Sequence, residues 1–342
     1  MRLILMLPRS VRSSRARRPV ALAAAGLLAV AATGALSGCS AFSDGADSPR
    51  SAQDGTVRVA TAFYALEFVA DRVTGGGALA QVDDLTQPGQ EPHDLELTVA
   101  ETEQIADADV VLYETALQPT VADAVEQNAT GATIDVGDVV DLLTLDDEGG
   151  HDEESLDGEA EQHVTDAEGN EIDPHFWLDP TRLAQVADAL ADALAEADPD
   201  HAEEYAANAA DLVSDLADLD AAYTQGLAQC ARSTIVVSHD AFGYLERYGL
   251  TVEGIAGLSP DAEPTPADLA RLHALIESDG ITTVFGERLA PASLSRTLAD
   301  DAGVTTAVLD PIEGLTDETA DEDYLSLMQE NLAALEKADG CR

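Results

Sequence analysis

Short runs of β-branched residues alternate with helical stretches along most of this chain, and this alternation constrains the fold more than any other feature. The runs lie at 56–63 (TVRVATAF), 109–113 (DVVLY), 132–136 (ATIDV), 233–238 (STIVVS), 281–285 (ITTVF) and 304–309 (VTTAVL). Strands that alternate with crossover helices form parallel sheets with covered faces. The pattern therefore predicts an α/β protein with two parallel-sheet lobes, for which 342 residues are sufficient.

The segment between the two groups of strands has the periodicity of one long helix. Apolar residues recur every three or four positions from Tyr205 to Leu227, and no glycine occurs there before Gly226. We expect a rigid helix over 200–229, which at the standard rise spans roughly 40 Å. It would join an N-terminal lobe at 56–199 to a C-terminal lobe at 230–342, although an ordinary packed helix is the simpler alternative.

The first 55 residues belong to neither lobe. Residues 1–38 combine arginines with an apolar stretch and lead into LSGC, which ends at Cys39, as in a bacterial lipoprotein signal peptide. Cleavage would leave Cys39 as a lipidated N-terminus that anchors the exported protein to the outer face of the cytoplasmic membrane. A transmembrane anchor fits less well, because the apolar run is short and rich in alanine and glycine. Residues 39–55 are small and polar and predict a flexible tether.

The charge of the chain excludes nucleic acid as a partner. The formal net charge is −49, and loss of the six arginines in residues 1–38 leaves 11 basic residues against 66 acidic ones, or −55. Phosphate backbones and anionic lipids would repel such a chain. The acidic surface is either simply solvated or gathers cations, so cation binding has to be argued from a specific site.

Two further segments carry local expectations. Besides Cys39 only Cys230 and Cys341 remain, and two thiols left over in an exported protein most often pair as a disulfide. Residues 146–173 are acidic and poor in apolar side chains, which predicts a surface loop inserted in the first lobe. Its two histidines, His151 and His163, either hold a metal ion weakly or are ordinary solvated residues.

Three histidines and two acids occupy the kind of place where parallel α/β proteins bind ligands. His93 lies in a loop bounded by proline and glycine, His175 lies in DPHFWLDP just before a helical pattern, and His239 directly follows a predicted strand. Glu287 and Asp310 follow two other strands. Loops at the carboxyl ends of parallel strands converge, and three imidazoles with one carboxylate satisfy a tetrahedral zinc shell. Singly, each residue also fits an ordinary role as a surface histidine, cap or turn former.

Five motifs occur in order along the chain: PGQEPHDLEL, DPHFWLDP, VVSHDAFGYLERYGL, GLSPDAEPTPADL and GVTTAVLDPIEGL. Together they resemble the zinc/manganese-uptake solute-binding lipoproteins of ABC transporters, the TroA-like, cluster A-I family, over residues 55–342. The resemblance implies two (β/α) lobes joined by a single long helix, with one metal ion in the interlobe cleft. It also implies a monomer that delivers the ion to a membrane permease.

The resemblance also implies a ligand set. Four residues match the family's ligand positions: His93, His175, His239 and Asp310. Glu287 is the alternative source of the last oxygen, and Asp240 and Asp94 could orient imidazole rings through their second nitrogen. Members with histidine at the third position are mostly zinc binders, whereas manganese binders usually have an acid there, so Zn²⁺ is favoured over Mn²⁺; a member of the same family that binds Mn²⁺ or Fe²⁺ is the alternative.

The chain departs from the family pattern in two places. Its inserted loop is acidic instead of histidine-rich, and Glu114 and Thr115 follow VVLY where the family usually has an Asn-Gly pair. Two other functions remain open. A zinc-dependent hydrolase would also use three histidines and an acid, although no HExxH motif is present and a fourth protein ligand leaves no open position for water. The resemblance further admits a surface adhesin.

Overall fold

The computed structural model describes residues 56–145, 164–165 and 169–342, all of which fall in one compact unit. The predicted signal peptide 1–38, Cys39, the tether 39–55 and the loop histidines His151 and His163 lie outside the described residues. Within the described part, no helix has both the length and the apolar character needed to cross a bilayer.

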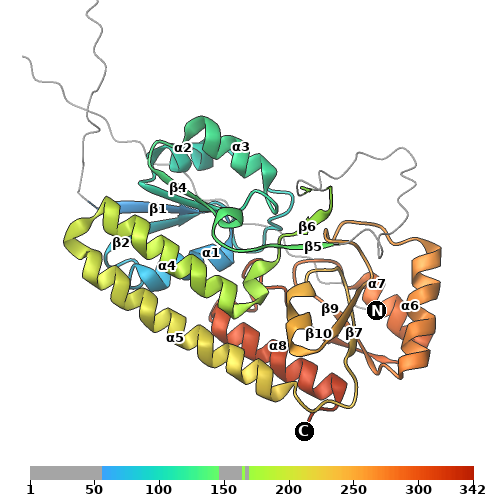
Figure 1. Ribbon diagram of the computed structural model, residues 1–342. Coiled ribbons are helices and arrows are strands. Elements are labelled where there is room, and N and C mark those ends of the chain that lie inside the picture. Colours follow the sequence, from blue (N-terminus) through green and yellow to red (C-terminus); the bar gives the residue numbers. More distant parts are fainter. Residues whose placement is uncertain (1–55, 146–163, 166–168) are drawn as a thin grey trace, which may run out of the picture. The chain divides into compact units, whose positions relative to one another are not determined.

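Four parallel strands form the first sheet, in the order β2-β1-β3-β4 (Figure 1). They are β1 (Val57–Thr61), β2 (Ala80–Asp84), β3 (Val110–Tyr113) and β4 (Ala132–Asp135). The apolar residues of the central strands β1 and β3 are buried, as expected when helices cover a parallel sheet. Four helices contact this sheet: α1 (Tyr64–Val73), α2 (Val99–Asp107), α3 (Pro119–Asn128) and α4 (Pro180–Ala197).

The second sheet is also parallel and has the order β10-β9-β7-β8. Its strands are β7 (Thr234–Val237), β8 (Thr251–Gly254), β9 (Thr283–Gly286) and β10 (Thr305–Val308). The sequence analysis missed the edge strand β8, because its residues TVEG are largely exposed and carry little apolar signal. Three helices contact this sheet: α6 (Pro266–Asp279), α7 (Ser293–Ala302) and α8 (Tyr324–Asp339).

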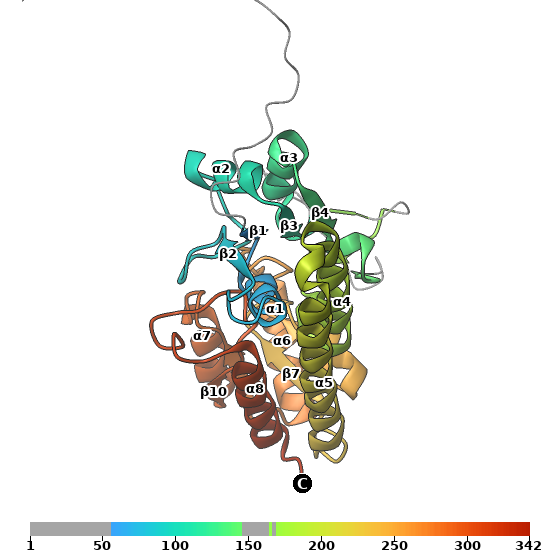
Figure 2. The same cartoon turned by 90° about the vertical axis from the view of Figure 1, so that its left-hand side faces the viewer.

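The predicted long helix is α5 (Ala202–Gly226), preceded by a 3-10 turn, η3 (Pro199–His201). Its apolar stripe is buried along its whole length: Tyr205, Ala209, Leu212, Leu216, Leu219 and Tyr223. Asn208 Nδ2 donates to the carbonyl of Val73 in α1 (3.0 Å), and the Tyr223 hydroxyl donates to the carbonyl of Met328 in α8 (2.7 Å). Figures 1 and 2 show α5 alongside α4 and reaching α8. The helix thus connects elements of both sheets, which confirms the predicted fold class.

Two segments next to the histidines have short regular structure. The stretch after His239 forms a 3-10 helix, η4 (Gly243–Tyr248). The predicted surface loop 146–173 ends earlier, because β6 (Glu171–Asp173) pairs antiparallel with β5 (Leu143–Leu145). This two-stranded ribbon holds the chain in place just before His175.

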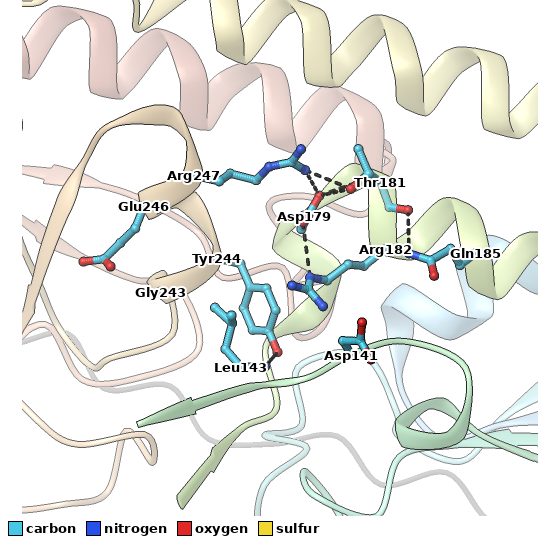
Figure 3. Close-up of a pocket in the computed structure, with 10 residues that line it drawn as sticks. All are labelled: Asp141, Leu143, Asp179, Thr181, Arg182, Gln185, Gly243, Tyr244, Glu246 and Arg247. Atoms are coloured by element: carbon cyan, nitrogen blue, oxygen red, sulfur yellow. Dashed lines mark hydrogen bonds and ion pairs between the residues drawn. The ribbon is translucent and has the colours of Figure 1, made fainter. Parts of the chain in front are cut away.

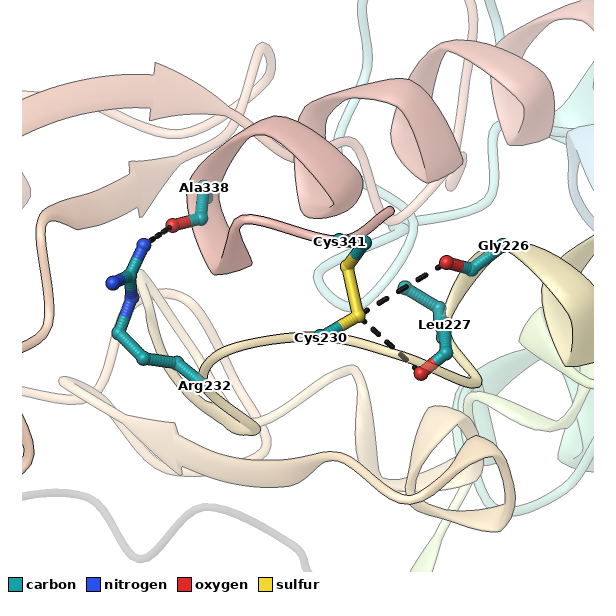
Figure 4. Close-up of a disulfide and its surroundings, with 6 residues drawn as sticks. All are labelled: Gly226, Leu227, Cys230, Arg232, Ala338 and Cys341. Atoms are coloured by element: carbon teal, nitrogen blue, oxygen red, sulfur yellow. Dashed lines mark hydrogen bonds between the residues drawn. A yellow bond between two sulfur atoms is a disulfide. The ribbon is translucent and has the colours of Figure 1, made fainter.

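A disulfide joins Cys230 to Cys341 across 111 positions of sequence (Figure 4). Figure 4 also shows Arg232 Nη2 donating to the carbonyl of Ala338 (2.5 Å). The backbone N–H of Ala231 donates to the carbonyl of Asp339 (2.9 Å). These contacts tie the segment that follows α5 to the C-terminal end of α8.

Replacing both cysteines by serine should lower the free energy of unfolding, because the unfolded chain regains the entropy that the cross-link removes. For a closed loop of this length the expected loss is about 2–5 kcal/mol. Denaturant unfolding of the wild type and of the Cys230→Ser/Cys341→Ser variant measures the difference. Reduction of the wild type should reproduce the loss, and unchanged unfolding curves in both experiments would contradict the account.

Candidate metal centre

Four side chains from four separate segments meet at one point: His93, His175, His239 and Glu313. His93 comes from the loop between β2 and α2, and His175 immediately precedes the 3-10 turn η2 (Phe176–Leu178). His239 follows β7, and Glu313 follows β10. One ligand atom from each residue lies within 4.8 Å of all the others. The structure therefore brings the three predicted histidines together, with a glutamate that the sequence analysis had not singled out.

The spacing of these atoms fits a small tetrahedral ion. Nε2 of His175 lies 3.3 Å from Nε2 of His93, and Oε1 of Glu313 lies 3.5 Å from Nε2 of His175. The same oxygen lies 3.6 Å from Nε2 of His93 and 3.2 Å from Nε2 of His239. Ligands at about 2.0–2.1 Å from zinc stand roughly 3.3–3.4 Å apart at the corners of a tetrahedron. The group can accept such an ion with little rearrangement.

Burial makes an unpaired polar group in this place costly. His175, His239 and Glu313 are fully buried, whereas the side chain of His93 keeps 12% of its surface exposed. Nε2 of His239 and both carboxylate oxygens of Glu313 have no hydrogen-bond partner among the described residues. Buried polar atoms normally have partners, and one cation would give a partner to Nε2 of His239 and to the Glu313 carboxylate together. The exposed edge of His93 marks the side from which a cation can arrive.

Two carboxylates hold the imidazole rings in place. Nδ1 of His175 bonds to Oδ1 of Asp173 at 2.8 Å, and Nδ1 of His239 bonds to Oε1 of Glu287 at 2.9 Å. A carboxylate that accepts a hydrogen bond from Nδ1–H keeps the ring proton on Nδ1, so the lone pair of Nε2 is left for a metal ion. Gly243 permits this arrangement at Asp173, because a Cβ on it would lie 2.8 Å from Oδ2 of Asp173.

The charges of the four residues are strongly linked. Burial lowers the pKa of His93. Burial also acts against protonation of His239, but Glu287 and Glu313 outweigh it and hold the pKa of His239 well above its usual value. Asp173 and Glu313 overcome burial in the same way and raise the pKa of His175. Burial favours a neutral Glu313, yet the imidazoles hold its pKa well below the usual range. The centre is therefore built to contain positive charge beside an ionised carboxylate.

Asp310, predicted as the fourth ligand, is not part of this group. Its Oδ2 accepts from Nε of Arg288 (2.7 Å), and its Oδ1 accepts from the backbone N–H of Ile312 (2.9 Å). Glu287, the predicted alternative, contacts Nδ1 of His239 and so supports the ring. Asp310, the acid nearest the end of β10, is thus bound to Arg288. Glu313, three residues later, is the carboxylate that reaches the histidines.

The sequence analysis suggested that Asp240 and Asp94 orient the imidazole rings. In the structure, Glu287 and Asp173 make these contacts instead. Burial raises the pKa of Asp240 to about 6. Asp94 is exposed, and a hydrogen bond shared with Asp261 raises its pKa. The prediction looked for acids next to each histidine in sequence. Glu287 acts instead from the neighbouring strand β9, and Asp173 acts from two positions before His175 inside DPHFWLDP.

Trp177, the only tryptophan, joins two of the ligand segments. Its ring packs against that of His175 with centroids 5.3 Å apart, and its Nε1 donates to the carbonyl of Pro311 (2.7 Å). Pro311 lies two residues before Glu313, so Trp177 fixes the distance between the His175 segment and the Glu313 segment. This contact accounts for the tryptophan in DPHFWLDP.

Glu114, one of the departures from the family pattern, is fully buried at the end of β3. Neither of its carboxylate oxygens has a hydrogen-bond partner among the described residues. Burial, with the negative charges of Asp135 and Asp173, raises its pKa well above the usual value. Its surroundings therefore favour the neutral carboxyl form, and it is not one of the four residues of the metal-ligand group.

A separate cavity of about 500 Å³ contains two arginines (Figure 3). Arg182 and Arg247 both contact the carboxylate of Asp179. The lining also contains Asp141 and Glu246, so its two arginines lie among three carboxylates. Tyr244, also in Figure 3, donates its hydroxyl proton to the backbone carbonyl of Asp173 (2.8 Å) and so supports the residue that holds His175.

Comparison with known proteins gives a consistent result. Residues 59–338 match the family model described as zinc-uptake complex component A, periplasmic. The zinc-binding lipoprotein AdcA of Streptococcus pneumoniae is 35% identical over 292 residues, which are 83% of this chain and 56% of that protein. The high-affinity zinc uptake system protein ZnuA of Bacillus subtilis is 31% identical over 286 residues, 82% of this chain and 86% of that protein. The chain thus spans little more than half the length of AdcA.

A solved structure extends the comparison to three dimensions. The crystal structure of the Zn(II)-bound ZnuA-like domain of Streptococcus pneumoniae AdcA matches with a TM-score of 0.67 and 33% identity. The match covers 83% of this chain and 99% of that one. The similarity therefore includes both sheets and α5.

We expect Glu287→Gln to weaken divalent-metal affinity by about 10–100-fold, because the His239 ring loses the carboxylate that sets its tautomer and orientation. Asp240→Asn is the matched control, since it removes a neighbouring carboxylate that does not contact the ring. Competition titration against a chromophoric chelator measures both variants. An equal loss in the two variants would show that nearby charge matters and ring orientation does not.

Proposed function

The chain belongs to the zinc-uptake complex component A family, and from this membership we propose that it is the extracytoplasmic solute-binding component of a metal ABC importer. It captures Zn²⁺ and delivers it to the membrane permease. The observation that carries the proposal is the group of three imidazole nitrogens and one carboxylate oxygen, whose ligand atoms lie within 4.8 Å of one another.

In this proposal the ion is held by Nε2 of His93, His175 and His239 and by Oε1 of Glu313. Three nitrogens and one oxygen at tetrahedral spacing suit zinc. Manganese and other hard ions prefer more oxygen ligands and higher coordination numbers. Zn²⁺ is therefore the favoured cargo over Mn²⁺ or Fe²⁺.

The ligand set favours capture over catalysis. A catalytic zinc ion keeps a position open for water or substrate. Here four protein ligands fill the shell, and three of the four are fully buried. An ion held in this way has no free position at which to activate water, so we assign the chain a binding role and no enzymatic one.

We place this capture outside the cytoplasm. The signal pattern of residues 1–38 supports export, and diacylation of Cys39 would anchor the protein at the outer face of the cytoplasmic membrane. The tether 39–55 would then let the two lobes, 56–199 and 230–342, reach the permease. All four proposed ligands come from one chain, so a monomer is sufficient.

Glu313→Gln should weaken zinc binding by more than the roughly 10–100-fold expected for a residue that only orients a ligand. The neutral amide is a poorer ligand and leaves the imidazoles without their compensating charge. Glu318→Gln changes an exposed glutamate of the same segment and serves as the control. Competition titrations of metal-free protein measure both. Near wild-type affinity in Glu313→Gln would overturn the assignment of the fourth ligand.

Zinc affinity should fall as the pH is lowered, because protons compete with the ion for the imidazoles. The pKa values of His175 and His239 are raised in the metal-free centre. As the pH is lowered, the zinc affinity should therefore start to fall at a pH higher than about 6.5, the pKa of an ordinary imidazole. Calorimetry in buffers of different ionisation enthalpy should detect proton release on zinc binding at neutral pH. Constant affinity from pH 8 to 6, without proton release, would contradict this expectation.

A further inference from the structure

Beyond the ligands themselves, we infer that Arg288 is a positioning residue for the bound ion. Through Asp310 it holds residues 310–313 in the strained turn that presents Glu313 to the three histidines. The inference rests on the proposed function, because it concerns the same centre, and it assigns a role to a cation that lies outside the ligand set.

The turn contains the one non-glycine residue with a positive φ among the described residues, Ile312 at +59°. A β-branched residue in this region is a genuine outlier, and it persists only where its surroundings over-determine it. The side chain of Ile312 is fully buried in the hydrophobic core, whereas the carboxylate of the next residue, Glu313, lies among the histidines. The left-handed conformation at Ile312 thus lets the Ile312 side chain pack in the core while the Glu313 side chain lies among the histidines.

Asp310 supplies much of the support for this turn. Its Oδ1 accepts from the N–H of Ile312 (2.9 Å), which closes the turn across Pro311. Its backbone N–H donates to Oδ1 of Asn331 (2.8 Å), and its carbonyl accepts from Nδ2 of the same residue (2.6 Å). Asn331 lies in α8, so the start of the turn is fixed to a helix. Beyond Glu313, the carbonyl of Leu315 accepts from the N–H of Gly89 (2.7 Å).

Arg288 keeps the carboxylate of Asp310 in this position. Its Nε donates to Oδ2 of Asp310 (2.7 Å), and its Nη2 reaches Oε2 of Glu330 (3.1 Å). Asp310 is only 5% exposed, and a buried carboxylate that loses its partner must neutralise itself or move. Either change weakens the acceptor for the Ile312 N–H. Without Arg288, therefore, the strained turn loses the restraint that Asp310 supplies, and Glu313 is held less firmly among the histidines.

Charge alone predicts the opposite effect. A guanidinium close to a cation site repels the cation, so its removal should tighten metal binding. Positioning predicts that removal of the same group weakens binding. The direction of the change in affinity therefore separates the two roles.

Arg296 provides a matched control, because it lines the same cavity of about 610 Å³ as Arg288 but makes no hydrogen bond or ion pair with residues 310–313 in the described part of the chain. We expect Arg288→Ala to weaken zinc affinity about tenfold or more, with faster release of zinc to a chelator. Arg296→Ala should bind zinc as tightly as the wild type or slightly more tightly. Arg288→Lys, which keeps the charge and a donor, should recover part of the loss. Equilibrium competition and stopped-flow release measure all four proteins.

A second measurement separates positioning from general damage to the fold. With Co²⁺ in place of zinc, the visible absorption of Arg288→Ala should shift toward that of Glu313→Gln, because both lose the carboxylate ligand. Affinity equal to or tighter than that of the wild type, or a wild-type cobalt spectrum in a variant that is merely less stable, would overturn the inference. Wild-type protein that binds no zinc would instead overturn the proposed function.

Discussion

The whole centre depends on one buried carboxylate, that of Glu313, placed among three imidazole nitrogens. A buried anion costs several kcal/mol unless a positive charge and good hydrogen bonds compensate it. Here the neighbouring carboxylates raise the pKa values of His175 and His239, which favours protons on these imidazoles, and a divalent ion would compete with those protons. The group therefore binds either protons or metal, and this competition is the physical basis of the proposed capture.

The position of that carboxylate depends on parts of the chain that lie far apart in sequence. His93 and His175 follow strands β2 and β6, whereas His239 and Glu313 follow strands of the second sheet. Helix α5 contacts α1, α4 and α8, so it holds the two sheets in a fixed relation. Trp177 then joins the His175 segment directly to Pro311. Such an arrangement limits large movements of one sheet against the other.

The strands, the long helix and the three histidines could be predicted from local patterns. β-branched runs identified six of the eight strands of the two parallel sheets, and the stripe from Tyr205 to Tyr223 identified α5. The choice of the fourth residue could not be predicted in this way. An acid at a strand end satisfied the rule for ligand positions, but Arg288, 22 residues away, already binds Asp310. Only the tertiary contact shows that Glu313 is the carboxylate left for the histidines.

X-ray absorption at the zinc edge, on mature protein loaded with one equivalent of zinc, tests the central claim most directly. The account predicts a four-coordinate ion with three imidazole nitrogens and one oxygen at about 2.0–2.1 Å. A six-coordinate, oxygen-rich shell, or a shell with fewer than three imidazoles, would contradict it.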